Sequence, residues 1–178
     1  MPSVNALLQD ILTATPGGAG SGFTKTYWFA TASTEADISH AGGATNTYLT
    51  NNGAGAKTSA YNPQSKSILW NASTNSYDFT SLKVGDIAEI SGIVSIDNLA
   101  AQGVDIFISM SEGTSSAHEH KVKHEYYKTA ATGTGIAFAY SVYMHDADAL
   151  AGGARIRFAS AQAASIDVDY FTAKVTEV

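Results

Sequence analysis

Cysteine is absent from the 178 residues, so the chain has neither a disulfide framework nor a cysteine nucleophile. A domain of this length buries roughly 70% of the surface that its unfolded chain exposes, so it can fold without a disulfide or a structural metal ion. The absence says little about the redox compartment, because a cysteine-free chain folds equally well in reducing and oxidising surroundings.

Charged residues are scarce, and those of positive sign are the scarcest. Charged side chains make up 15% of the sequence, and 16 acidic residues outnumber 10 basic ones, for a formal net charge of −6. Nonspecific binding to nucleic acid needs clustered Lys and Arg that displace counterions from phosphates. The densest basic group, Lys121, Lys123 and Lys128, is interleaved with Glu119 and Glu125, so its field largely cancels. We therefore expect no nucleic-acid partner.

Long apolar runs are also missing. No stretch approaches the roughly 18 consecutive apolar residues that span a bilayer, and residues 1–14 lack the basic start and continuous apolar core of a signal peptide. We therefore expect no membrane partner and no export by a signal peptide. The abundant Ala, Gly, Ser and Thr suit repeated contact with neighbouring protein copies, although an ordinary weakly charged domain has the same composition.

Motifs of several enzyme classes are missing as well. The sequence has no GxSxG nucleophile elbow, and its glycine clusters do not lie between a strand and a following helix, as phosphate-binding and dinucleotide-binding loops do. A glycosidase needs only two carboxylates, but no pair among the 16 acidic residues stands out. We expect no enzymatic activity, no catalytic residue and no cofactor.

The chain begins with a short amphipathic segment, residues 4–14, which is predicted to be a helix with Ser3 as its N-cap. Residues 15–22 read TPGGAGSG and form a tether with a reach of roughly 15 Å. A helix this short is marginal in water, so its apolar stripe must pack on its own β-domain, on other copies or on another protein. A self-capping helix is usually joined by a tighter turn, so docking to another polypeptide is favoured. The predicted docking residues are Val4, Leu7, Leu8, Ile11 and Leu12.

Residues 23–178 are predicted to form one β-domain, so residues 1–22 are separated from it as a docking arm. The aromatic run at 23–32 is the first predicted strand, and a second lies at 45–50 before a hairpin turn at Asn52-Gly53. Further strands are expected at 67–71, 76–80, 86–97, 103–111, 118–128, 135–145, 154–160 and 164–177. Strands at this spacing predict two packed antiparallel sheets.

The alternation of apolar residues also predicts which side chains form the core. In the last strand the apolar phase moves from Ile166, Val168 and Tyr170 to Phe171 and the residues after it, which predicts a β-bulge near Tyr170. The other expected inward-facing residues are Ile68, Trp70, Tyr77, Phe79, Val104, Ile106, Ile108, Met110, Ile136, Phe138, Tyr140, Val142 and Met144.

The candidate surface-contact residues lie in one predicted strand, 118–128, which contains HEHKVKH followed by Glu125 and two tyrosines. His118, His120 and His124 are expected on one face, but alternate strand positions lie about 6.5–7 Å apart, so two imidazoles share a metal ion only if their rotamers converge. We predict a solvent-facing or interface strand and no metal; if the histidines meet across an interface, acid should weaken it. Tyr126 and Tyr127 point to opposite faces, so at least one should form a surface contact, with carbohydrate or protein.

Two Asp-x-Asp pairs offer oxygen ligands for calcium, but they lack the Gly and the distal Glu of an EF-hand loop. We therefore expect Asp146 and Asp148 to be solvated. The second Asp-x-Asp pair, Asp167 and Asp169, is expected on the polar face of the last strand. Its cross-strand partners there are predicted to be Arg155 and Arg157 of the preceding strand.

The segments LKVGDIAEISGIVS, GVDIFISMSEG and RIRFASAQAASIDVDYFTAKVTEV resemble jelly-roll modules of tailed-bacteriophage structural proteins, such as head decoration or cement proteins, head fibres and tail fibres. The likeness covers residues 67–178. It implies a homotrimer on the surface of a virion, made in the host cytoplasm and bound to the major capsid protein or another virion protein.

The expected function is that of a noncatalytic capsid decoration protein or short head fibre. The alternative is a carbohydrate-binding or receptor-binding tail-fibre module. A third hypothesis, a secreted or cell-surface interaction domain of the trimeric jelly-roll type, is disfavoured by the missing signal sequence.

Overall fold

A computed structural model describes residues 25–32, 37–43, 46–50, 57–58, 69–71, 73–97 and 99–178; for residues 25–32 and 57–58 it describes the backbone alone. The predicted docking arm, with Val4, Leu7, Leu8, Ile11 and Leu12, lies outside the described residues. The division into an arm and a β-domain therefore stays a prediction.

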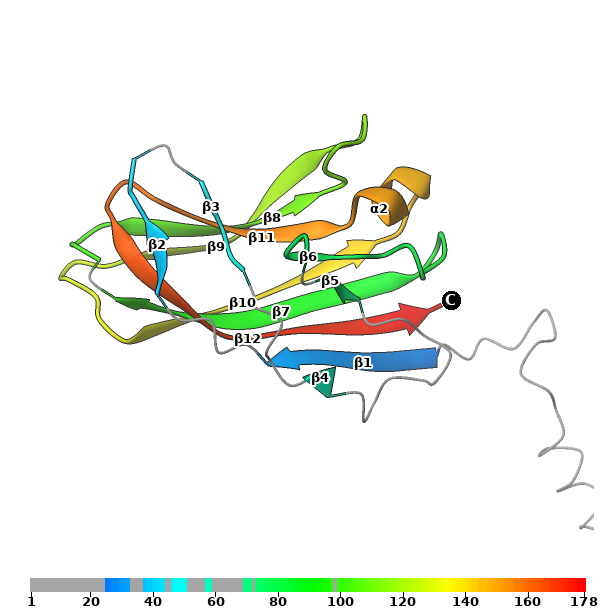
Figure 1. Cartoon of the computed structure of the whole chain (residues 1–178), viewed down its shortest axis with the longest axis horizontal. Helices are drawn as coiled ribbons and strands as arrows, with labels where there is room; N and C mark the ends of the chain where they lie inside the picture. Colours follow the sequence, from blue (N-terminus) through cyan, green and yellow to red (C-terminus); the bar gives the residue numbers. More distant parts are fainter. Residues whose placement is uncertain are drawn as a thin grey trace, which may run out of the picture.

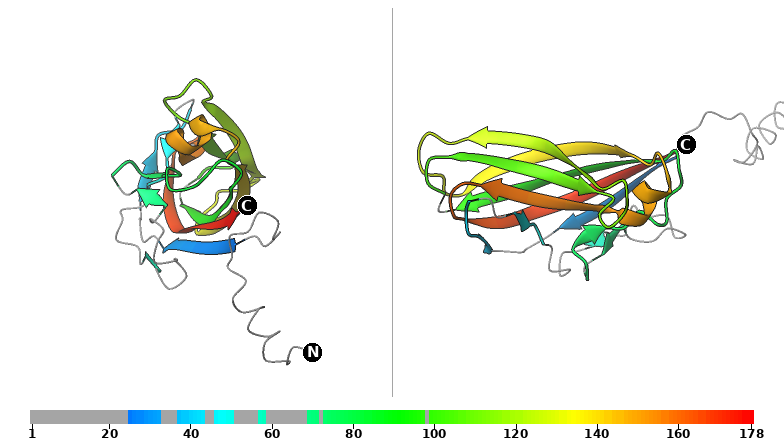
Figure 2. Two further views of the ribbon diagram at one scale, coloured as in Figure 1. Left: turned by 90° about the vertical axis from the view of Figure 1, so that its right-hand side faces the viewer. Right: turned by 90° about the horizontal axis from the view of Figure 1, so that it is seen from above.

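The described residues form two antiparallel six-stranded sheets that pack against each other (Figures 1 and 2). The first sheet has the order β10-β7-β12-β1-β4, with β2 paired to β12, and the second has the order β5-β6-β11-β8-β9, with β3 paired to β11. The first contains β1 (Lys25–Ala32), β2 (Ile38–His40), β4 (Lys57–Thr58), β7 (Ile87–Asp97), β10 (Thr134–Tyr143) and β12 (Ala164–Glu177). The second contains β3 (Thr47–Tyr48), β5 (Trp70–Asn71), β6 (Ser76–Tyr77), β8 (Gly103–Met110), β9 (His118–Tyr126) and β11 (Ala154–Ser160). This is the antiparallel, jelly-roll-like β-sandwich that the sequence predicts.

The six long strands predicted between residues 86 and 177 are all present, and their ends differ from the predicted ones by at most two residues. They were predictable because each strand alternates apolar and polar residues, which allows its sheet to bury one face and expose the other. The first predicted strand is present as β1, whereas β3, β5 and β6 occupy only two residues each within longer predicted strands.

The hairpin expected at residues 52 and 53 is wrong. Strand β3, before this turn, pairs with β11 in the second sheet, and β4, after it, pairs with β1 in the first sheet. The turn residues themselves lie outside the described residues. An Asn-Gly pair favours a tight turn, but here the chain crosses from one sheet to the other.

Helix α2 (Ala147–Gly152) has no counterpart in the sequence prediction, because six residues are too few to show a helical period. Asp146, expected to be solvated, is its N-cap: the Asp146 side chain accepts a hydrogen bond of 2.9 Å from the backbone N–H of Ala149. The helix ends at Gly153, whose φ of 61° lies in the region that favours glycine.

The β-bulge predicted near Tyr170 is confirmed. Val168 pairs with Val94 and Tyr170 pairs with Ile93, so β12 holds one extra residue, Asp169, between two adjacent partners on β7. The bulge reverses which residues face inward, and Tyr170 is 38% exposed, although its predicted phase placed it in the core.

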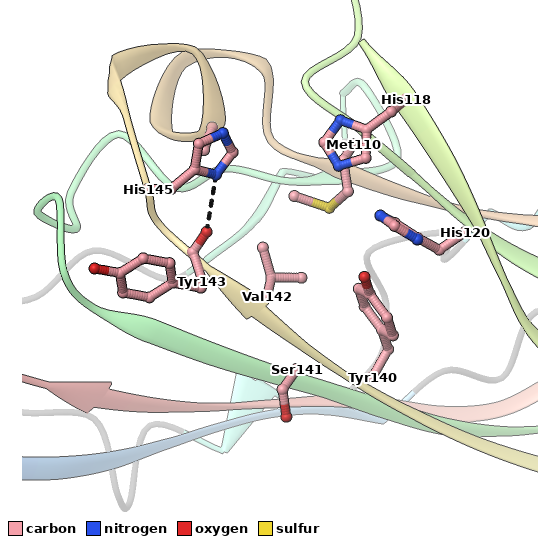
Figure 3. A pocket seen from close by; sticks show the side chains of 9 residues that line it. Met110, His118, His120, Tyr140, Ser141, Val142, Tyr143 and His145 are labelled. Atoms are coloured by element: carbon pink, nitrogen blue, oxygen red, sulfur yellow. Dashed lines mark hydrogen bonds between the residues drawn. The ribbon is translucent and has the colours of Figure 1, made fainter. Parts of the chain in front are cut away.

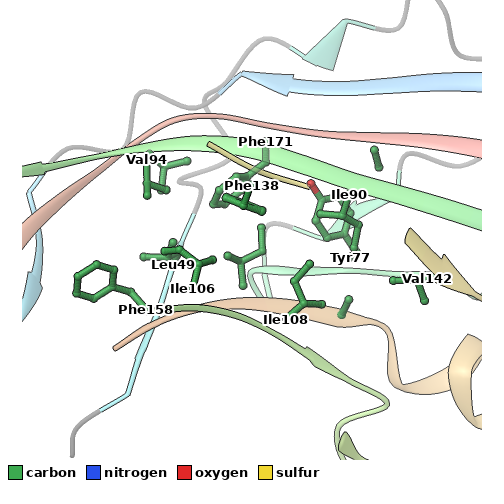
Figure 4. Close-up of a cluster of buried hydrophobic side chains, with 14 of the residues drawn as sticks. Leu49, Tyr77, Ile90, Val94, Ile106, Ile108, Phe138, Val142, Phe158 and Phe171 are labelled. Atoms are coloured by element: carbon green, nitrogen blue, oxygen red, sulfur yellow. The ribbon is translucent and has the colours of Figure 1, made fainter. Parts of the chain in front are cut away.

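Aromatic side chains fill the centre of the sandwich (Figure 4). The ring centroid of Phe171 lies 5.8 Å from that of Trp70 and 6.0 Å from that of Phe138. Gly92 on β7 makes room for these rings, because a Cβ atom there would lie 2.7 Å from Phe171 Cδ1 and 2.9 Å from Phe138 Cζ. The described core residues predicted from the sequence are buried apart from Tyr170, which is exposed, and Tyr140, which is half-buried; Ile68 lies outside the described residues.

Candidate functional site

The candidate site lies where the sandwich has an open side. Strand β10 is the last strand of the first sheet and β9 is the last strand of the second, and the two edges contact each other. A cleft of about 250 Å³ lies between them. Its lining includes His118 and His120 of β9, Tyr140 and Tyr143 of β10, and His145 beyond the end of β10 (Figure 3). Tyr140 is half-buried because it borders this cleft.

The expectation that His118, His120 and His124 share one face is wrong, because β9 contains a bulge. Ile106 of β8 pairs with Lys123 and the next residue, Phe107, pairs with Lys121, so Val122 is an extra residue in β9. Before the bulge, His118 and His120 pair with Met110 and Ile108, whose side chains are buried in the core. After the bulge, His124 pairs with Asp105 and lies on the opposite, outer face.

His118 and His120 are held next to each other at the mouth of the cleft (Figure 3). Their ring centroids lie 4.9 Å apart with an interplanar angle of 85°, and His120 stacks on Tyr140 at 5.1 Å and 28°. Nδ1 of His118 lies 2.6 Å from the carbonyl oxygen of Ser116, so it carries the proton and donates a hydrogen bond. The Nε2 atom of His118 is then the unprotonated nitrogen of the neutral ring.

His124 belongs to an ion-pair network on the outer face of the second sheet. Its Nδ1 atom lies 2.6 Å from Asp105 Oδ1, and Lys121 Nζ lies 2.8 Å from Asp105 Oδ2. Burial by itself would raise the pKa of Asp105, but the hydrogen bonds and charges of Lys121 and His124 outweigh it, so the pKa is lowered. The chemistry of His124 is therefore separate from that of the cleft.

The expected pairing of Asp167 and Asp169 with Arg155 and Arg157 is also wrong. Strands β11 and β12 belong to different sheets, so these side chains do not lie across from one another. Arg155 pairs with Glu112 at 3.1 Å. Arg157 instead makes a bidentate ion pair with Glu119 of β9, and its guanidinium lies 4.4 Å from the ring centroid of Phe107.

The Asp-x-Asp carboxylates accept hydrogen bonds from protein donors. Asp169 Oδ2 accepts from Ser95 Oγ at 2.8 Å, and Asp148 Oδ2 accepts from Ser116 Oγ at 2.8 Å. Asp167 Oδ1 accepts from the backbone N–H of Asp37 at 2.6 Å. Within the described part of the chain, no group of three or more His, Asp or Glu side chains is arranged to hold a metal ion.

The structure places the two adjacent tyrosines differently. Tyr126, at the end of β9, is 64% exposed. Tyr127 is half-buried against the core, its backbone N–H donates to the carbonyl oxygen of Gln102, and burial, followed by the charge of Glu125, raises its pKa. Tyr126 is therefore the one of the two that presents an open aromatic face.

Sequence reasoning missed the contribution of β10 to the cleft. Tyr143, 55% exposed, and His145 gave no sequence signal, because their proximity to His118 and His120 depends on the packing of the two sheets.

Across the described residues, no helix is long and apolar enough to span a membrane.

No protein-family model and no curated protein matches this sequence. Three of the solved structures that are similar to it match between 58% and 87% of the chain. The Clostridium thermocellum endo-1,4-beta-D-xylanase 10B CBM22-1-GH10 modules complexed with xylohexaose match at 11% identity and a TM-score of 0.38, over 58% of this chain and 19% of that one. A chain of the infectious bursal disease virus Gx strain matches at 11% identity and a TM-score of 0.43, over 87% of this chain and 32% of that one.

The third is the CBM22-1 xylan-binding domain of Paenibacillus barcinonensis Xyn10C, at 12% identity and a TM-score of 0.42, over 83% of this chain and 98% of that one. The chain spans only about a fifth and a third of the first two matching chains. At these identities and TM-scores, the similarities assign no ligand, activity or assembly to this protein.

Proposed function

We propose that this chain is a noncatalytic structural component of a virus particle, a capsid decoration protein or short head fibre, that docks through residues 1–22. One observation carries the proposal: the buried apolar side chains that the structure describes, from Leu49 to Val175, form one connected core. The sequence places the amphipathic segment beyond an eight-residue glycine-rich stretch from this domain, and such a long connection favours docking to another polypeptide.

The docking energy would come from the apolar stripe of that segment. Complete burial of one Leu, Ile or Val side chain contributes about 1.5–3 kcal/mol. Five such residues at helical spacing make a contact that is modest for one subunit, and many copies on one particle, or three in one trimer, multiply it.

The outer face of the first sheet supports a role in repeated protein contacts. Along β10 the exposed positions Gly135, Ala137, Ala139 and Ser141 carry small, uncharged side chains. They pair in register with Ser95, Ile93, Ser91 and Glu89 of β7. A row of small, uncharged positions along this edge strand can approach another copy closely without desolvating ionised groups.

Truncation tests the proposal. A chain comprising residues 23–178 should keep its thermal unfolding midpoint within about 2 °C, because the proposal assigns the arm no part in the core of the β-domain, yet it should no longer cosediment with virus particles stripped of the protein. A full-length Leu8→Asp, Ile11→Asp variant should lose attachment in the same way. The matched control adds the same two charges on the polar side of the segment, as Asn5→Asp with Gln9→Asp, and should still attach.

Two results would overturn the docking proposal. If the truncated chain unfolds many degrees lower, the segment completes the core of its own domain. If it attaches with unchanged affinity, the arm is not the anchor. The copy number in purified particles, measured by mass spectrometry, separates a head protein, present in hundreds of copies, from a tail protein, present in a handful.

A carbohydrate-binding tail-fibre module is the second candidate, and the exposure of Tyr126 favours it. An aromatic ring that is 64% exposed at the end of a strand can stack on the apolar face of a pyranose. On a glycan array, Tyr126→Ala should abolish any binding, while Tyr170→Ala, which removes a 38% exposed tyrosine from the other sheet, should preserve it. An array without any bound glycan, or equal losses in both variants, would eliminate this candidate.

A further inference from the structure

We propose that His118 and His120 form a binding site for a divalent ion of the late first transition series, such as Zn²⁺, Ni²⁺ or Cu²⁺, at the mouth of the cleft between β9 and β10. The site does not depend on the proposed virion role and goes beyond it. Imidazole nitrogen is the ligand that these ions share a preference for.

The spacing of the two rings is the first argument. Two imidazoles bound to one tetrahedral zinc ion, each with a Zn–N distance of about 2.0 Å, have ring centres roughly 5 Å apart. The centroids of His118 and His120 are 4.9 Å apart, and the planes cross at 85°. The spacing of these two alternate strand residues therefore matches the spacing of two imidazoles bound to one ion.

The orientation of His118 is the second argument. Histidines that bind metal ions commonly donate their other ring N–H to a backbone carbonyl or a carboxylate, which fixes the tautomer and the ring orientation. The Nδ1–H of His118 makes such a bond to the carbonyl oxygen of Ser116 at 2.6 Å and leaves Nε2 for a ligand. His120 is held in a different way, by its stacking on Tyr140.

The surroundings of the pair are the third argument. Both rings line the cleft of about 250 Å³, which has room for an ion and for the water molecules that complete its coordination. Lys121 follows His120 in the sequence, but its side chain is directed to the outer face, where it binds Asp105. Its positive charge is therefore kept on the side of β9 opposite the two histidines.

The other nearby histidines are excluded by geometry. The bulge at Val122 moves His124 to the outer face, where it contacts Asp105. His145, on the far side of the cleft, lies 3.1 Å from Asp146 Oδ2 and 3.3 Å from the Tyr143 carbonyl oxygen. The site thus has two protein ligands and two tetrahedral positions for water.

The test uses the full-length chain without an added histidine tag, freed of metal and titrated with Zn²⁺ alone in a calorimeter. We expect one zinc ion per chain, and His118→Ala and His120→Ala should each weaken binding about tenfold or more. His124→Ala is the matched control, because it makes the same change on the same strand but on the other face, and it should alter the affinity less than about twofold. Zinc should likewise raise the thermal midpoint of the native chain and of the His124→Ala variant, but not that of His118→Ala or His120→Ala.

The midpoint of each variant without metal checks its folding, and the exposed His118 is the substitution expected to disturb it least. X-ray absorption at the zinc edge should report two imidazole nitrogens. The proposal is overturned if zinc up to about 1 mM gives no binding heat, if His124→Ala weakens binding as much as His118→Ala does, or if a well-folded His118→Ala chain binds zinc as the native chain does.

Discussion

Replacement of Glu119 by Ala is expected to be costly because it leaves a buried cation without its partner. The Arg157 side chain is 7% exposed and donates from Nε at 2.6 Å and from its NH2 group to the Glu119 carboxylate. The same carboxylate accepts from Ser109 Oγ at 2.9 Å. After the substitution, the guanidinium would remain pressed against Phe107, with its centre 4.4 Å from the ring centroid and no anion beside it.

The size of the effect follows from the exposure of the two partners. Removing one member of a fully buried ion pair costs about 3–5 kcal/mol, and an exposed pair contributes at most about 1 kcal/mol. Glu119 is 36% exposed, so water can reach part of the vacated space and solvate the guanidinium. We therefore expect a loss of about 2 kcal/mol in the free energy of unfolding, which lowers the thermal midpoint of a chain this size by about 4–8 °C.

Urea unfolding at pH 7 provides the measurement, and the control is Glu125→Ala. Glu125 also belongs to β9, but its partner Lys123 is exposed like itself, so the control should cost less than about 0.5 kcal/mol. Arg157→Met should destabilise the native chain by about 1 kcal/mol yet leave the Glu119→Ala chain unchanged or more stable, since it removes the unpaired charge.

The reasoning would be refuted if Glu119→Ala cost no more than Glu125→Ala. It would also be refuted if Arg157→Met destabilised both backgrounds equally, because the two residues would then contribute independently. Asp169→Ala tests the partner that the sequence suggested for the arginines. It should lower stability by no more than about 0.5 kcal/mol, because Asp169 is exposed and its partner is Ser95.

Two further predictions concern backbone geometry and pH. In the same urea assay, Gly153→Ala should destabilise the protein by more than about 3 kcal/mol or prevent folding, because its φ is 61° and a Cβ atom would lie 2.1 Å from the Tyr77 carbonyl oxygen. The control is Gly113→Ala, whose φ is 80° but whose Cβ atom would point into open space. It should cost only about 1–2 kcal/mol. The lowered pKa of Asp105 means that its ion pairs stabilise the fold fully above the unfolded value of about 3.9 and that this contribution disappears as pH falls through the lowered folded value. Asp105→Asn should therefore be less stable than the native chain at pH 6 and approach its stability near pH 2, and a stability difference that stayed constant with pH would contradict the assignment.

Periodicity along the chain determined the long strands, most of the described core and one of the two β-bulges found among the described residues. Ile166 and Val168 alternate in one phase and Phe171 in the other, so the sequence itself records the extra residue in β12. Such features are local, because an apolar residue at every second position is sufficient to bury one face of a strand.

The bulge in β9 left no such record, since His118, His120, Val122 and His124 alternate without interruption. Only the register against β8 makes Val122 the extra residue and sends His124 to the outer face. A strand's period describes its own two faces, but the position of a bulge also depends on the partner strand that it must match.

Tertiary structure likewise decided which charges and rings meet. Arg157 pairs with Glu119 because β11 and β9 flank β8 in one sheet, whereas β12, next along the chain, belongs to the other sheet. His120 meets Tyr140 because β9 and β10 are the edges of different sheets on the same side of the sandwich. The sequence determines how each strand divides its residues between two faces, and only the packing of the sheets determines what each face meets.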